Sequence, residues 1–100
     1  MISLKKVDDG YKIKFELDYI YPSHKHLIKE LFNDYMIKKE DKLIIDISKV
    51  KIIDISSFKN MFIEIMKLKS SGKDVIIIFP EDDNDNYVSR IFELTKFEKK

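Results

Sequence analysis

Cysteine is absent from this 100-residue chain, which excludes disulfide bonds, thiolate catalysis and cysteine metal sites. No apolar run reaches the roughly 20 residues that a membrane-spanning helix needs. The N-terminus has no apolar segment behind its lysines, so we expect no signal peptide and a cytoplasmic protein. With only two glycines and two prolines, no stretch reads as a linker, and the length predicts a single domain over residues 1–100.

Charge of one sign is also lacking, because 19 basic residues nearly balance 18 acidic ones and leave a net charge of +1. A near-neutral chain has no overall field that would attract nucleic acid or an anionic membrane. Hydrophobic residues make up 44% of the chain, which is ample for a packed core. The composition therefore favours a small folded domain that binds neither nucleic acid nor membrane directly.

Four segments have the patterns of strands: residues 2–7, 11–17, 43–47 and 75–79. Residues 11–17 alternate between apolar and charged side chains, which predicts a half-buried strand. Residues 43–47 and 75–79 are apolar on both faces, which predicts central strands covered on both sides. Asp8-Asp9-Gly10 predicts a hairpin turn between the first two strands, since Asp-Gly favours turns with positive φ.

Three segments have the spacing of helices. Pro22 suits the first turn of a helix whose apolar stripe runs over residues 27–35, and a second stripe covers residues 58–68, with Gly72 placed to end that helix. Residues 87–94 predict a short third helix. The order strand-strand-helix-strand-helix-strand-helix predicts an α/β domain, with a mixed, mostly parallel sheet of about four strands and helices packed on it.

Motifs for metal or cofactor binding are missing. His24 and His26 are two positions apart, so on a helix they would point to different faces and could not share a metal ion. The acidic residues 81–86 lack the ligand register of a calcium-binding loop. No glycine-rich phosphate-binding motif occurs. We therefore expect neither a metal nor a cofactor.

Ser56 and Ser57 follow Asp54 where the second helix should begin. Serine and aspartate are common helix N-caps, so from spacing alone simple capping is the favoured interpretation. A hydrolase nucleophile would need flanking glycines for its strained turn and a base within hydrogen-bond reach. The sequence offers no such glycines, and its two histidines lie on a different helix, so we expect no enzymatic activity.

Residues 43–58, LIIDISKVKIIDISSF, resemble the central signature of the STAS family of anti-sigma factor antagonists. In that signature a strand ending in aspartate leads through a second aspartate into a serine turn and a helix. Asp46, Val50 and Asp54 match its positions. Shorter likenesses extend the resemblance over nearly the whole chain, at residues 15–18, 71–75 and 88–97.

The resemblance implies a bacterial signalling protein that binds a partner anti-sigma serine kinase and thereby controls transcription. In this type the kinase phosphorylates a serine at the start of the second main helix, and the phosphorylated form dissociates. The matching position is Ser56, with Ser57 as the alternate, and the implied partner-binding residues are Asp54, Ile55, Ser56, Ser57 and Phe58. Ser57 stands where the family usually has glycine.

Two alternatives remain open. A non-phosphorylated STAS subunit, such as the small cytoplasmic partner of a lipid-transport ATPase, would use the same surface as a permanent dock. The second alternative is an enzyme, which would be supported by turnover of a substrate that is lost when Ser56 is replaced.

Tyr19 and Tyr21, before the first helix, either mark a contact surface or cover the edge of the core. The sequence leaves open whether the protein forms a homo-oligomer.

Overall fold

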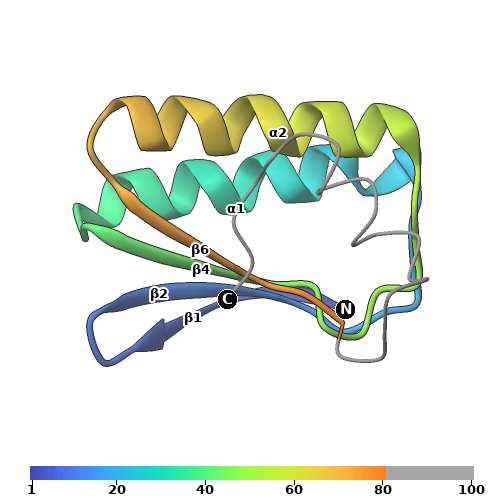
Figure 1. The fold of residues 1–100 in the computed structure, drawn as a ribbon, viewed down its shortest axis with the longest axis horizontal. Coiled ribbons are helices and arrows are strands. Elements are labelled where there is room, and N and C mark those ends of the chain that lie inside the picture. The colour runs from blue at the N-terminus through green and yellow to red at the C-terminus, as the bar shows by residue number, and fades with distance from the viewer. Residues whose placement is uncertain (81–100) are drawn as a thin grey trace.

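A computed structural model describes residues 1–80 of the chain. Its main sheet has the strand order β1-β2-β4-β6. Strand β1 is antiparallel to β2, whereas β2, β4 and β6 run parallel (Figure 1). The strands are β1 (Ile2–Val7), β2 (Gly10–Phe15), β4 (Lys42–Asp46) and β6 (Asp74–Ile78). The mixed, mostly parallel sheet of four strands predicted from the sequence is confirmed.

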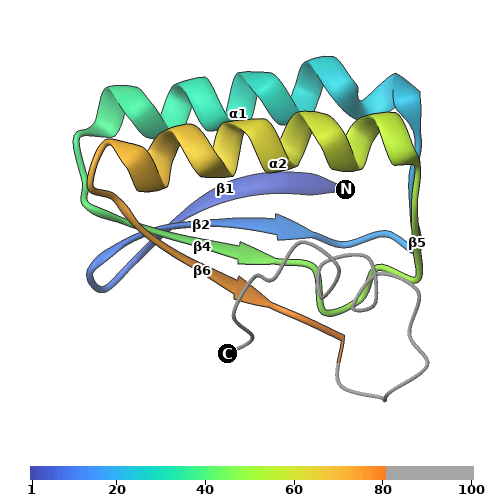
Figure 2. The same cartoon turned by 45° about the horizontal axis from the view of Figure 1, so that its top comes forward.

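Two long helices cover one face of this sheet. Helix α1 (Lys25–Lys38) follows a 3-10 turn, η1 (Pro22–His24), and helix α2 is Ile55–Ser70. Figures 1 and 2 show the two helices side by side on the same face. The predicted third helix, residues 87–94, lies outside the described residues.

Alternation along the strands sorts side chains onto the two faces of the sheet. Ile13, Ile45 and Ile77 are aligned across three parallel strands, and all three are buried. Their neighbours Ile44 and Ile76 point to the opposite face and are half-buried. The core of the described residues therefore lies between the sheet and the two helices.

Gly10 is needed for a different reason from the one the sequence suggested. The turn between β1 and β2 is Asp8–Asp9, and Gly10 pairs with Val7 as the first residue of β2, without a positive φ. A Cβ atom at Gly10 would lie 2.2 Å from the carbonyl oxygen of Lys42. Glycine is required here because β2 and β4 approach too closely for any side chain.

Both helices end in a left-handed residue. Lys39, with φ of 59°, follows α1, and Gly72, with φ of 91°, follows the last turn of α2. The amide of Lys73 then donates to the carbonyl of Leu68 at 3.0 Å, which closes the end of α2. The predicted role of Gly72 at the end of the second helix is confirmed.

Two further strands were not predicted, β3 (Tyr19–Ile20) and β5 (Ile52–Ile53). They pair with each other in parallel and form a separate small sheet. Two residues are too few for a hydrophobic period to be recognised. This small sheet is nevertheless what positions the candidate site.

Candidate functional site

The candidate site lies where the chain leaves the carboxyl ends of β2 and β4. Each of these strands leads through a short strand, β3 or β5, into a helix. Pairing of Tyr19 with Ile52 and of Ile20 with Ile53 ties the two connections together. Ile20 and Ile53 are buried, whereas Tyr19 and Ile52 face outward. In parallel sheets this edge is where binding sites commonly form.

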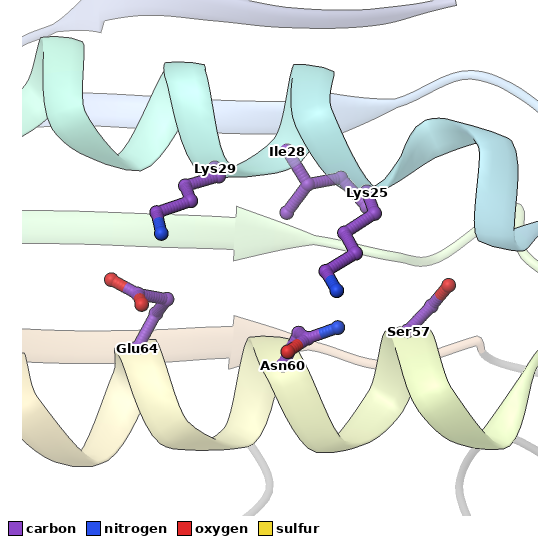
Figure 3. Close-up of a pocket in the computed structure, with 6 residues that line it drawn as sticks. All are labelled: Lys25, Ile28, Lys29, Ser57, Asn60 and Glu64. Atoms are coloured by element: carbon purple, nitrogen blue, oxygen red, sulfur yellow. The ribbon is translucent and has the colours of Figure 1, made fainter.

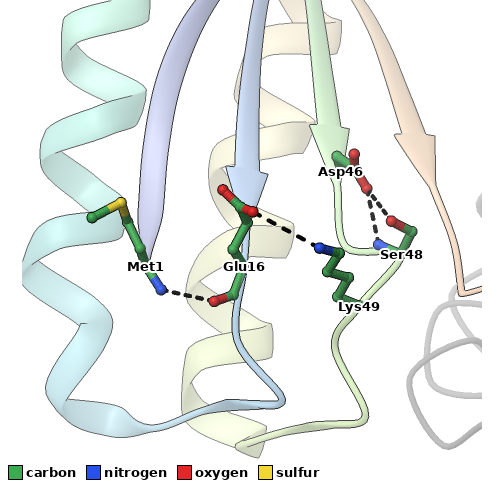
Figure 4. Close-up of polar contacts among 5 residues, drawn as sticks. All are labelled: Met1, Glu16, Asp46, Ser48 and Lys49. Carbon is green, nitrogen blue, oxygen red and sulfur yellow. Dashed lines mark hydrogen bonds and ion pairs between the residues drawn. The ribbon is translucent and has the colours of Figure 1, made fainter.

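Asp46 shapes the turn that follows β4 (Figure 4). Its Oδ1 accepts hydrogen bonds from the amide of Ser48 at 3.0 Å and from the Ser48 hydroxyl at 2.6 Å. The next residue, Lys49, forms an ion pair with Glu16 at 3.8 Å, and the amino group of Met1 donates to the Glu16 carbonyl at 2.8 Å. The first aspartate of the STAS-like signature is therefore a buried turn residue rather than a binding group.

Backbone hydrogen bonds then fix the entry into α2. The amides of Lys51 and Ile52 donate to the carbonyl of Asp18 at 2.7 and 3.1 Å. The amide of Asp54 donates to the carbonyl of Ile20 at 2.9 Å. These bonds anchor the residue before α2 to the small sheet.

Asp54 is the N-cap of α2. Its Oδ2 accepts a hydrogen bond from the amide of Ser57 at 3.1 Å and another from the hydroxyl of Ser56. These two bonds, with that from Ser56 the larger cause, hold the pKa of the Asp54 carboxyl below its usual value. Of the residues that the sequence offered as caps, Asp54 occupies the N-cap, and Ser56 lies in the first turn of α2.

Ser56 and Ser57 differ sharply in exposure. The Ser56 side chain is exposed, and its hydroxyl donates to Asp54. Ser57 is only 1% exposed, and its hydroxyl donates to the carbonyl of Tyr21 at 3.2 Å. Of the two serines singled out by the sequence, only Ser56 has an exposed side chain.

Ser57 borders a small cavity between the two helices (Figure 3). The cavity has a volume of about 60 Å³ and is lined by Lys25, Ile28, Lys29, Ser57, Asn60 and Glu64. A single water needs roughly 10–15 Å³ of such space, so there is room for a few waters. The serine that stands at the family's glycine position therefore turns its side chain inward.

Phe58 is also buried. Its ring stacks with that of Phe62 at a centroid separation of 6.0 Å on one side of α2. Of the five predicted partner-binding residues, Ile55 and Ser56 are exposed and Asp54 is half-buried. Ser57 and Phe58 are buried and leave little side-chain surface exposed, and the assignment of the five residues to partner binding stays a prediction.

Exposed apolar side chains surround this helix start. Tyr19 is 42% exposed, Tyr21 53%, Ile52 46% and Ile55 52%. Tyr19, Tyr21 and Ile52, together with Asp54, line a shallow hollow of about 350 Å³, and Ile55 follows Asp54 in the chain. We call these four apolar residues, Tyr19, Tyr21, Ile52 and Ile55, the β3–β5 patch. The sequence had singled out both tyrosines and Ile55, but Ile52 was missed because β5 was missed.

His24 has a local structural role. Its Nδ1 accepts a hydrogen bond from the amide of Tyr21 at 2.9 Å, and the two rings lie 5.8 Å apart. The histidine thereby fixes the backbone that carries Tyr21. Within residues 1–80 no three histidine or acidic side chains gather as metal ligands. No helix in this part of the chain is long and apolar enough to cross a membrane.

No protein-family model matches this chain, and no curated protein matches it. A solved structure does match, described as the anti-sigma factor antagonist SpoIIAA in its unphosphorylated form. The TM-score is 0.73, over 96% of this chain and 81% of that one, with 12% sequence identity. An identity this low shows a shared fold and no more. The chain thus has the small α/β fold of SpoIIAA, with a mixed four-stranded sheet, and the STAS resemblance is supported at the level of the fold.

Proposed function

We propose that this protein is a STAS-type regulator that binds a partner anti-sigma serine kinase and is released when that kinase phosphorylates Ser56. Three features support the proposal together: the fold shared with SpoIIAA, the STAS-like signature, and the exposed hydroxyl of Ser56. The known structure that it resembles is described as an anti-sigma factor antagonist. That description supports an anti-sigma factor as the partner, and the STAS-like signature of residues 43–58 is what adds a serine kinase to the proposal.

The observation that carries the proposal is the position of Ser56 beside the β3–β5 patch. Four large apolar side chains, each about half exposed, gather at the start of α2. Exposed aromatic and aliphatic side chains that gather at one place are typical of protein interfaces. A phosphate on Ser56 would place negative charge next to the apolar surface that a partner would cover.

Phosphorylation would act on this surface through desolvation. A phosphate adds nearly two negative charges where an apolar partner surface would exclude water. Burying such a charge without a cation costs several kcal/mol, and each ~1.4 kcal/mol is a tenfold loss of affinity. The unmodified protein would then bind, and the phosphorylated protein would dissociate.

We propose binding rather than catalysis, because the neighbour of Ser56 is a poor base. An effective general base has a pKa near the working pH. Hydrogen bonds from Ser56 and Ser57 instead lower the pKa of Asp54, so its carboxylate has little tendency to take a proton from the serine. Asp54 is engaged as a helix cap, which is a structural role.

The test is affinity capture from lysate of the source cells with three baits: wild type, Ser56→Ala and Ser56→Asp. We expect the first two to retain an ATP-binding kinase and Ser56→Asp to lose it, with phosphate mapped to Ser56 on the wild-type protein. Ser70→Asp is the matched control, because it adds the same charge at an exposed serine at the other end of α2. It should retain the kinase.

The alternative is a constitutive docking subunit, such as the STAS partner of a lipid-transport ATPase. The same β3–β5 patch favours this reading too, since a permanent dock also needs exposed apolar surface. Retention of one transport ATPase subunit by all three baits would establish the alternative and contradict the switch. Turnover of an ester or phosphate substrate that disappears in Ser56→Ala would contradict both.

A further inference from the structure

We propose that Asp54 transmits the charge state of Ser56 to the backbone, so that a phosphate on Ser56 loosens the first turn of α2 and its attachment to β3. The inference rests on the proposed function in taking Ser56 as the modified residue. It adds that modification changes the order of the docking surface as well as its charge.

Asp54 joins Ser56 to the small sheet through hydrogen bonds. Its carboxylate Oδ2 accepts from the Ser56 hydroxyl and from the Ser57 amide. Its own amide donates to the carbonyl of Ile20 at 2.9 Å, and its carbonyl accepts from the amide of Phe58 at 2.8 Å. A shift of Asp54 therefore disturbs the helix start and the β3–β5 connection together.

Phosphorylation of Ser56 replaces an attractive hydrogen bond to Asp54 with repulsion between two negative charges. A new bond forms between the serine Oγ and the terminal phosphorus of a nucleoside triphosphate held by the kinase. The terminal phosphoanhydride bond breaks, the nucleoside diphosphate leaves, and the hydroxyl proton is released to solvent or to a base of the kinase. The donor that Asp54 accepted from is gone, and an anion of nearly two charges replaces it.

The carboxylate of Asp54 is ionised at neutral pH, as its lowered pKa indicates. Two anions two residues apart then compete for the same helix end, where the Ser57 amide can donate its hydrogen bond to only one of them. The phosphate carries the larger charge and can take over that amide. Asp54 is then displaced from the N-cap position. This displacement also weakens the hydrogen bond from the Asp54 amide to the Ile20 carbonyl.

Displacement at Asp54 reaches the β3–β5 patch directly. Asp54 lines the same hollow as Tyr19, Tyr21 and Ile52, and Ile55 is the next residue along the chain. The partner therefore loses an ordered apolar surface in addition to meeting a phosphate.

Amide hydrogen exchange measured by NMR tests the inference on the isolated protein. Phosphoserine is placed at position 56 by genetic encoding, which needs no kinase, and Ser56→Asp is prepared beside it. We expect the protection factors of the Asp54, Ser57 and Phe58 amides to fall severalfold in both proteins relative to wild type. Amides in the last turn of α2 should not change.

Asp54→Asn gives the matched background, because asparagine caps helices about as well as aspartate but carries no charge. In this background the same modifications at position 56 should leave protection unchanged or raise it, since an anion alone favours a helix N-terminus. Salt at 1 M should reduce the fall seen beside Asp54, since it shortens the screening length to about 3 Å. If Asp54→Asn fails to fold, Asp54→Ser serves the same purpose.

Unchanged or raised protection beside an intact Asp54 would overturn the inference, and so would an equal fall in the Asp54→Asn background. Neither readout involves a partner. A protein that shows the coupling but captures no kinase would contradict the proposed function alone, and one that releases the kinase without any change in exchange would contradict this inference alone.

Discussion

The two ends of the domain use tyrosine in opposite ways. At the end where the helices terminate, Tyr35 is fully buried, its hydroxyl donates to the Glu40 carbonyl at 2.8 Å, and its ring meets Tyr11 edge-on at 6.5 Å. At the end where the helices begin, Tyr19 and Tyr21 lie 5.8 Å apart and stay about half exposed. A buried ring whose hydroxyl is hydrogen-bonded stabilises the fold, whereas exposed rings leave apolar surface in contact with solvent.

Lysines strengthen this contrast. Lys73 donates to the Glu40 carbonyl at 2.9 Å and pairs with Asp41 at 3.7 Å, while Lys6 lies over the Tyr11 ring at 5.2 Å and pairs with Glu40. At this end of the domain, where the helices terminate and which is called the closed end below, charged and polar groups bind one another. The end where the helices begin, called the open end below, instead leaves Tyr19, Tyr21, Ile52 and Ile55 about half exposed around one capped helix start.

The largest expected effect is at the closed end. Removing the Tyr35 ring leaves a cavity in the core, so Tyr35→Ala should lower the free energy of unfolding by about 3–5 kcal/mol. Tyr21→Ala should lower it by no more than about 0.5 kcal/mol, as for an exposed residue. Urea unfolding at 25 °C measures both. If both variants lost a similar amount of unfolding free energy, the open end would also stabilise the fold, and the contrast between the two ends would be wrong.

The next effect concerns binding at the open end. Tyr21→Ala and Ile55→Ser should each weaken the captured kinase complex by tenfold or more, because large apolar anchors dominate interface energies. Ile37→Ser is the control, since Ile37 is an exposed isoleucine on α1 outside the β3–β5 patch. Titration calorimetry with the purified partner gives the dissociation constants. Equal losses for Ile55→Ser and Ile37→Ser would remove the β3–β5 patch from the interface.

Long, periodic segments made most of this fold predictable from the sequence. Alternation over residues 11–17 and the two isoleucine-rich runs gave the sheet, and the apolar stripes gave α1 and α2. In each segment the sequence pattern itself shows which face is buried, so the order of the four main strands and of α1 and α2 was predicted correctly, whereas β3 and β5 were missed.

The site was less predictable, because it depends on pairing between distant residues. The β3–β5 pair joins residues 33 positions apart, from Tyr19 to Ile52, over only two residues per strand. Without it, nothing in the sequence showed that Ile52 joins the tyrosines. Within α2, the choice of Asp54 as cap rotates Ser57 and Phe58 into the domain and leaves Ser56 outside. The position of Asp54 is held by hydrogen bonds to Ser57 and to Ile20, and residue spacing alone does not predict the bond to Ile20.

A smaller effect is expected from the Tyr35 hydroxyl alone. Tyr35→Phe should lower the free energy of unfolding at pH 8 by about 0.5–1.5 kcal/mol, which is the usual contribution of one intramolecular hydrogen bond. Burial raises the pKa of the Tyr35 phenol above its ordinary 10.0, and the charges of Asp41, Glu40 and Asp74 add to it. The folded state therefore prefers the neutral phenol, so this group's contribution is intact below about pH 10 and is lost as the pH rises further.

Urea unfolding of wild type and Tyr35→Phe at pH 8, 9, 10 and 11 measures this dependence. The difference in the free energy of unfolding between the two proteins should be constant up to about pH 10 and should decrease above it, because only the wild type has a phenol to ionise at this position. Lysine deprotonation affects both proteins alike and cancels in the difference. A gap that stays constant through pH 11 would contradict a raised pKa for Tyr35.

The smallest expected effect belongs to the open end, at Asp54. Hydrogen bonds from Ser56 and then Ser57 lower the pKa of its carboxyl, so the folded state prefers the ionised form. The stabilisation is therefore present above the ordinary pKa of 3.8 and is lost as the pH falls through the lower folded value. Thermal unfolding of wild type and Asp54→Asn from pH 6 down to pH 2.5 should show the wild-type advantage disappearing at the acid end. Ser56→Ala should reduce the same acid dependence, because the serine hydroxyl is the main cause of the shift. If Ser56→Ala leaves it unchanged, the hydroxyl is not held by Asp54 in solution, and the open end loses the link through which a charge on Ser56 would reach the fold.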